Sequence, residues 1–158
     1  MMKILLSYSL FFALLALSNG KWLRSIDSND IRSISAGNML GKCRGYCRRS
    51  INMTVDPLQI IAMNEPNYEQ LDYPPTQRQF LFSLVEWQQI LSLIDSERFQ
   101  ALNDQIECSS ECYADWVQWI QIDWIDNSSK QITFHGTTVP GFEMLVEKLN
   151  QMKEQYQV

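Results

Sequence analysis

The chain of 158 residues contains a single histidine, His135, and few signs of a catalytic site. It has no G-x-S-x-G, H-E-x-x-H, phosphate-loop or dinucleotide-binding pattern. A histidine that acts as a general base needs a matched partner nearby, and sequence spacing does not supply one. We therefore expect a binding or interaction domain that acts by surface recognition rather than catalysis. The alternatives are a small secreted hydrolase that uses His135 with a carboxylate, or a structural extracellular component.

Long hydrophobic runs are also scarce. A membrane-spanning helix needs about 20 apolar residues, and no run beyond the first twenty residues approaches that length. The apolar run from Ile4 to Leu17 follows Lys3 and ends in small residues before Lys21, which is the layout of a cleaved secretory signal. We expect residues 1–20 to be a signal peptide, no stable membrane anchor, and a secreted, extracellular protein.

Basic residues are outnumbered, with 13 Lys and Arg against 18 Asp and Glu, and they are unevenly placed. Residues 21–50 hold seven basic and two acidic side chains, whereas residues 51–158 hold five and sixteen. A chain with a pI of about 4.8 and no basic face across the domain is not expected to bind nucleic acid. Four basic residues crowd one turn and form a candidate patch for an anionic glycan or an extracellular protein: Lys42, Arg44, Arg48 and Arg49. The alternative is that the acidic remainder of the chain compensates them internally.

The only four cysteines form two C-x-x-x-C pairs: Cys43 with Cys47, and Cys108 with Cys112. An even number in an exported chain favours disulfides, and a four-thiolate zinc site or a redox site is the alternative. Local and crossed pairings are both open, although Gly45 allows a tight turn and favours the local one. No metal and no cofactor are expected.

N-x-[ST] sequons make Asn52 and Asn127 candidate glycosylation sites.

Periodicity predicts a chain of hairpins and helices. Residues 31–36 predict a weak first strand, and alternation over 49–55 predicts a strand with one buried face. Asp56-Pro57 ends that strand and turns the chain into a returning strand at 58–63. The further predicted elements are a long polar loop at 64–79, a helix after a Ser83–Glu86 capping box, a short helix after Asp95, a strand at 115–125 paired with 131–135, and a last helix over 142–152.

The strand at 115–125 is apolar on both faces. Trp119 shares its face with the polar residues Gln121 and Asp123. If that face is open, Trp119 is a candidate contact for a protein or a sugar ring. The alternative is that the 64–79 loop or a helix covers it.

The order hairpin, helix, hairpin, helix predicts a two-layer α+β domain. Its antiparallel sheet would contain two hairpins plus a short N-terminal strand, packed against two or three helices. We expect the domain to span residues 31–153, after an N-terminal extension at 21–30 and before a frayed tail at 154–158.

The segments "GKCRGYCRRSINMT", "EWQQILSLIDSERFQAL", "ADWVQWIQIDW", "KQITFHG" and "PGFEMLVEKLNQM" resemble a family of small exported domains, mainly bacterial with eukaryotic relatives. In that family a G-x-C-x-G-x-C segment opens an antiparallel sheet, and no function is established. The resemblance covers about residues 31–153; many members have proline where this chain has Arg48. Some relatives have only the first cysteine pair, so the resemblance implies a local bridge between Cys43 and Cys47.

Overall fold

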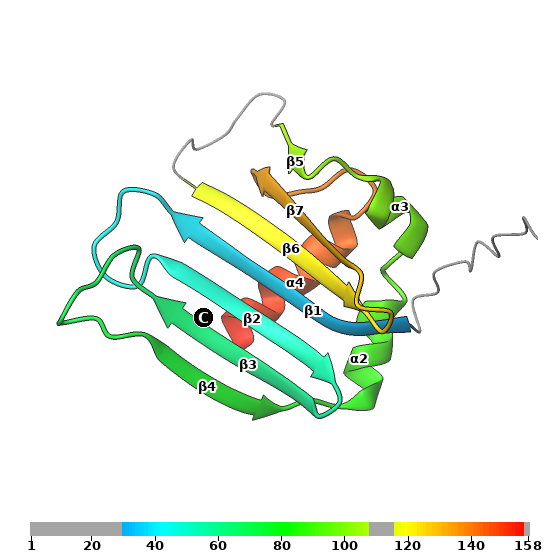
Figure 1. Ribbon diagram of the computed structural model, residues 1–158, viewed down its shortest axis with the longest axis horizontal. Helices are drawn as coiled ribbons and strands as arrows, with labels where there is room; N and C mark the ends of the chain where they lie inside the picture. The colour runs from blue at the N-terminus through cyan, green and yellow to red at the C-terminus, as the bar shows by residue number, and fades with distance from the viewer. Residues whose placement is uncertain (1–29, 108–115, 157–158) are drawn as a thin grey trace, which may run out of the picture.

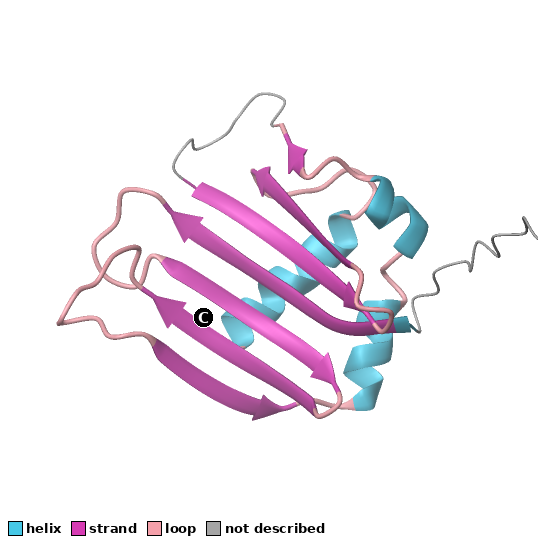
Figure 2. Ribbon diagram, viewed as in Figure 1, coloured by secondary structure: helices cyan, strands magenta, loops and turns pink. Residues whose placement is uncertain are grey.

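The computed structural model describes residues 30–107 and 116–156. Within these segments the chain forms seven strands and three helices, and the strands join into one sheet (Figure 2). The strands are β1 (Ile31–Leu40), β2 (Arg48–Val55), β3 (Leu58–Glu65), β4 (Thr76–Leu81), β5 (Gln105–Ile106), β6 (Trp116–Trp124) and β7 (Ser129–His135). The helices are α2 (Leu84–Leu91), α3 (Ser96–Ala101) and α4 (Glu143–Gln155).

The strand order across the sheet is β4-β3-β2-β1-β6-β7-β5. The two predicted hairpins are present as β2–β3 and β6–β7, and β1 lies between them, antiparallel to both β2 and β6 (Figure 1). β3 and β4 are also antiparallel, whereas β5 pairs with β7 in parallel. The predicted α+β class, with a mainly antiparallel sheet, is confirmed.

The sheet is wider than predicted. β4 and β5 are additional strands, and β1 continues to residue 40, past its predicted end at residue 36. The expected loop at 64–79 is shorter at both ends because Glu65 still belongs to β3 and Thr76 begins β4. β4 is an edge strand with mostly exposed residues, so its polar sequence lacks the alternation that marks a half-buried strand.

One face of the sheet carries the hydrophobic core. Ile51 and Met53 in β2 are fully buried, whereas Asn52 between them is partly exposed on the other face, as the alternation predicts. Figure 1 shows α4 passing behind the sheet, and its Leu145 and Leu149 belong to the same buried cluster. The opposite face, which carries Asn52, is called the open face below.

The helix starts predicted from capping residues are present. The Ser83 hydroxyl accepts a hydrogen bond from the Glu86 backbone N–H at 3.1 Å, and the Glu86 carboxylate accepts one from the Ser83 backbone N–H at 3.2 Å. Asp95 caps α3 with a single hydrogen bond, which its carboxylate accepts from the Arg98 backbone N–H at 3.0 Å. Trp87 of α2 is buried, whereas Leu84, the first residue of the helix, is 57% exposed.

The C-terminal helix is longer than expected. α4 continues to Gln155, past the predicted end of order at residue 153, and the Tyr156 ring packs against Phe80 with centroids 4.8 Å apart. Outside the described segments lie the predicted signal peptide at 1–20, residues 21–29 of the predicted extension, and the second cysteine pair. None of the helices in the described segments is long and apolar enough to cross a membrane.

Candidate functional site

The turn between β1 and β2 is closed by the first cysteine pair. The sulfur atoms of Cys43 and Cys47 lie 2.10 Å apart, which is compatible with the predicted local disulfide. The Leu40 backbone N–H donates to the Cys47 carbonyl at 2.9 Å, so the base of the turn is closed as well. Gly45 has a φ of +98°, a left-handed conformation that favours glycine. Residues 41–47 are called the disulfide loop below.

A second loop, residues 66–75, packs against the disulfide loop. The Gly45 backbone N–H donates to Gln70 Oε1 at 3.1 Å, and the rings of Tyr46 and Tyr73 meet edge to face with centroids 5.6 Å apart. The Asn67 side chain donates to the carbonyl of Leu40 at 2.6 Å. The shortened remnant of the predicted polar loop therefore supports the disulfide loop.

A cavity of about 1080 Å³ lies between the disulfide loop, the neighbouring end of the sheet and the last turns of α4. Its lining combines cations, aromatic rings and side-chain amides. The side chains that line it include Arg44, Arg49 and Lys153, the rings of Tyr46, Tyr73 and Trp116, the amides of Asn38 and Asn150, and the carboxylate of Glu154. A concave site that brings cations, amides and aromatic rings together is a candidate ligand-binding site.

The wall of the cavity begins where the core of the sheet becomes polar. Asn38 of β1 lies between Gln118 of β6 and Arg49 of β2 as their cross-strand neighbour. The next cross-strand row on the same face, two residues along each strand, is apolar and consists of Ile120, Ala36 and Ile51. Gln118 is 1% exposed and donates to the Gly136 carbonyl at 2.6 Å. The amide oxygen of Gln118 therefore points away from Gly136 and can accept a hydrogen bond.

Lys153 of α4 is the donor to this amide oxygen. Its ammonium group donates to Gln118 Oε1 at 3.3 Å, and the residue is only 7% exposed. Burial disfavours the charged form and lowers the pKa of the Lys153 amine from its ordinary 10.5 to about 8. At neutral pH the site therefore holds a mostly protonated, largely buried amine whose protein partner is a neutral amide.

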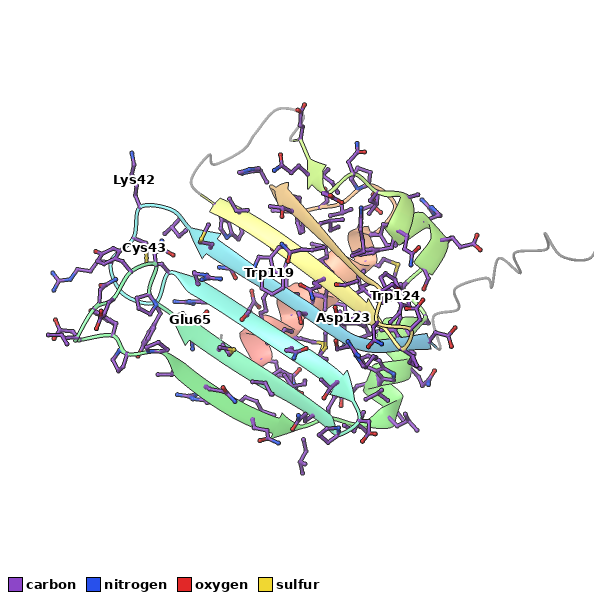
Figure 3. The ribbon with its side chains drawn as sticks, viewed as in Figure 1. Lys42, Cys43, Glu65, Trp119, Asp123 and Trp124 are labelled. Atoms are coloured by element: carbon purple, nitrogen blue, oxygen red, sulfur yellow. A yellow bond between two sulfur atoms is a disulfide. The ribbon has the colours of Figure 1, made fainter. Side chains whose placement is uncertain are left out.

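The four basic residues of the predicted patch are divided between several places. Arg44 and Arg49 line the cavity, and Arg44 also forms an exposed ion pair with Asp72 at 3.6 Å. Arg48 alternates with Arg49 along β2 and belongs to the open face. Lys42 is exposed at the tip of the disulfide loop, outside the cavity lining, and points away from the fold (Figure 3). The predicted patch therefore contributes two of its members to the cavity.

Trp119 lies on the open face, in front of the sheet in Figure 3. Its ring is so close to Gly37 of β1 that a Cβ atom added there would lie 2.6 Å from Cε2 of the indole. α4 lies on the opposite face, and the loop at 66–75 packs on the disulfide loop, so neither element covers Trp119. The ring is partly buried against its own sheet and does not line the cavity.

His135 is also away from the cavity, at the end of β7 beside Val117. Its Nδ1 atom is buried and has no hydrogen-bond partner among the residues that the structure describes. Within residues 30–107 and 116–156 no carboxylate lies within ion-pair distance of His135. The pairing of His135 with a carboxylate, on which the alternative of a small hydrolase depends, is not formed there.

The two sequons lie at the surface. Asn52 is partly exposed in the middle of the open face, where its Oδ1 accepts from the Ser35 hydroxyl at 3.0 Å. Asn127 is exposed in the β6–β7 turn and accepts from Arg32 at 2.9 Å. Both positions are compatible with the predicted glycans.

As to metals, the part of the chain that the structure describes holds no group of three or more His, Cys, Asp or Glu side chains that could bind an ion.

Lys153 and the aromatic wall of the cavity were not singled out by the sequence analysis. The usable signal was the position of Lys153 in its helix. It follows the buried Met152 and lies four residues after the buried Leu149, so it falls on the apolar stripe of α4. A lysine is rarely buried unless its charge has a partner.

A comparison with models of known protein families finds no match for this chain. A comparison with curated proteins also finds no significant match.

Proposed function

We propose that this protein is an exported binding domain that recognises an anionic extracellular glycan through the cavity beside the disulfide loop. One observation supports the proposal most strongly. Three cationic side chains (Arg44, Arg49 and Lys153) converge with aromatic rings and amides on one concave site. The proposal includes a secretory signal at residues 1–20 and a two-layer packing of the domain at 31–153, with the family resemblance extending over the same range.

The charges favour an anion at this place. The cavity lining contains three Lys or Arg side chains and a single carboxylate, that of Glu154. The protein as a whole carries a net charge of −5, so the cavity differs in sign from the rest of the molecule. Such a contrast directs an anionic ligand to one site and discourages non-specific contact elsewhere.

The composition favours a glycan over an acidic protein segment. Aromatic rings offer flat apolar surfaces on which sugar rings pack, and side-chain amides pair with hydroxyl groups as both donors and acceptors. Tyr46, Tyr73 and Trp116 supply the rings, and Asn38 and Asn150 supply the amides. The disulfide loop and the 66–75 loop hold several of these groups in place before a ligand arrives, which lowers the entropy cost of binding.

The test is retention of the secreted protein on immobilised heparin, read as the salt concentration that elutes it. The double variant Arg44→Ser/Arg49→Ser removes two cations of the cavity and should elute at clearly lower salt. Lys42→Ser/Arg48→Ser removes the same charge from the same turn but outside the cavity and should elute close to the unmodified protein. Equal losses in the two variants, or no retention of the unmodified protein, would contradict the proposal.

A further inference from the structure

We propose, building on the proposed function, that Lys153 binds the carboxylate of an acidic sugar residue of the uronic acid type, whose ring lies against the aromatic wall of the cavity. This assigns one position of the glycan to one side chain. The inference rests on the geometry around the Lys153 amine and on the groups that surround it.

The Lys153 ammonium group has hydrogen-bonding capacity to spare. It carries three N–H donors, and in the described segments its one acceptor is Gln118 Oε1 at 3.3 Å, a long contact. The residue is more than nine-tenths buried and lines the cavity. A buried charge with too few partners is costly, and a carboxylate that enters the cavity would supply both a counter-charge and acceptors.

The charged and titratable groups around Lys153 leave room for such an anion. Arg49 faces the cavity from β2, Arg44 and Tyr46 from the disulfide loop, and Tyr73 from the 66–75 loop. Glu154 is the only carboxylate among the lining residues, and Lys153 forms no ion pair with it. Lys153 is the lining cation whose pKa, at about 8, lies within an easily accessible pH range.

A sugar acid fits the cavity better than a small inorganic anion or a fatty acid. A small anion would leave the Tyr46, Tyr73 and Trp116 rings without a ligand partner, and a fatty acid would leave the Asn38 and Asn150 amides without partners. A pyranose ring presents C–H groups to the Tyr46, Tyr73 or Trp116 rings and hydroxyl groups to the amides. The volume exceeds that of one ring, so neighbouring residues of a glycan chain have space as well.

The interaction should weaken at alkaline pH. A carboxylate binds the protonated amine, so affinity is constant well below the pKa of Lys153 at about 8 and falls as the pH rises through it. For a single titrating group the expected loss between pH 7 and pH 9 is about tenfold. Because the carboxylate of the ligand is ionised throughout this range, the loss reports on the protein.

The experiment is a titration of the full secreted protein with glucuronate at constant ionic strength, followed by ligand-observed NMR. Glucose tests the ring without the acid, and acetate tests the acid without the ring; both should bind at least tenfold more weakly than glucuronate. Lys153→Met should weaken glucuronate binding at least tenfold and remove its pH dependence. Lys42→Met removes an exposed lysine next to the cavity and should bind like the unmodified protein.

Three outcomes overturn the inference. The first is glucuronate binding that Lys153→Met leaves unchanged, and the second is an affinity of the unmodified protein that does not change between pH 7 and pH 9, a readout that needs no variant. The third is the absence of glucuronate binding. Retention on heparin without any binding of glucuronate refutes this inference and leaves the proposed function standing. Failure of the unmodified protein to be retained on heparin refutes the proposed function. The two failures are therefore distinguishable.

Discussion

At the scale of single residues, Lys153 is a charged group held where its neighbours in α4 are apolar and buried. Its pKa of about 8 in the folded protein lies below its ordinary value of 10.5 because burial penalises the ammonium form. Between these two pH values the unfolded chain binds more protons than the folded one, so the free energy of unfolding rises with pH across this window. Below pH 8 the penalty is present in full.

Replacing Lys153 with methionine should therefore stabilise the protein. At pH 7 the expected gain in the free energy of unfolding is at most about 3 kcal/mol, from 1.36 kcal/mol for each pKa unit. The gain should shrink as the pH rises from 8 towards 10.5, because the unmodified protein loses its penalty there. Urea denaturation of both proteins across this range measures the difference, and Lys42→Met serves as the exposed control. A difference that does not vary with pH would contradict the assignment.

Several residues could be assigned from the sequence and others could not. The alternation of Ile51 and Met53 with Asn52 identified a buried face, because a strand places successive side chains on opposite sides. The polar wall of the cavity could not be predicted. The pairing of three strands makes neighbours of Gln118, Asn38 and Arg49. The spacing of these residues in the sequence does not predict that pairing.

At the scale of elements, the start of α2 rests on the reciprocal hydrogen bonds of Ser83 and Glu86. The hydrogen bonds from Ser83 lower the pKa of the Glu86 carboxyl. Ser83→Ala should reduce the free energy of unfolding by about 1 kcal/mol and return the pKa of Glu86 towards its ordinary value. Gln89→Ala, at an exposed position of the same helix, should change the free energy of unfolding by no more than about 0.5 kcal/mol. Chemical denaturation and NMR titration measure the two effects; an unchanged pKa of Glu86 in Ser83→Ala would show that the capping box is not formed.

The elements themselves were predictable to different degrees. The capped helices and the two hairpins have local signals, since capping residues, turns and alternation all act over a few neighbours. The position of β1 between the hairpins was not predictable, because it depends on pairing with β6, more than seventy residues away. β4 was missed for a different reason: an exposed edge strand needs no apolar face.

At the scale of the whole molecule, the disulfide loop connects β1 with β2 and forms one wall of the cavity. Replacing Cys43 and Cys47 together with serine frees a loop of about five residues, and loop-closure entropy gives a cost of about 2 kcal/mol. The larger effect should fall on binding, because Arg44 and Tyr46 lose their fixed positions. Thermal unfolding and heparin retention measure the two effects separately. Retention equal to that of the unmodified protein would show that the loop does not position the site.

The central claim is that binding takes place in the cavity and not on the open face around Trp119. The most direct measurement is chemical-shift mapping by NMR of the ¹⁵N-labelled protein with a heparin-derived tetrasaccharide. We predict shifts concentrated in the disulfide loop, at Arg49 and at residues 150–154 of α4, with little change at residues 119–123. Shifts centred on Trp119, or spread evenly over the surface, would contradict the claim.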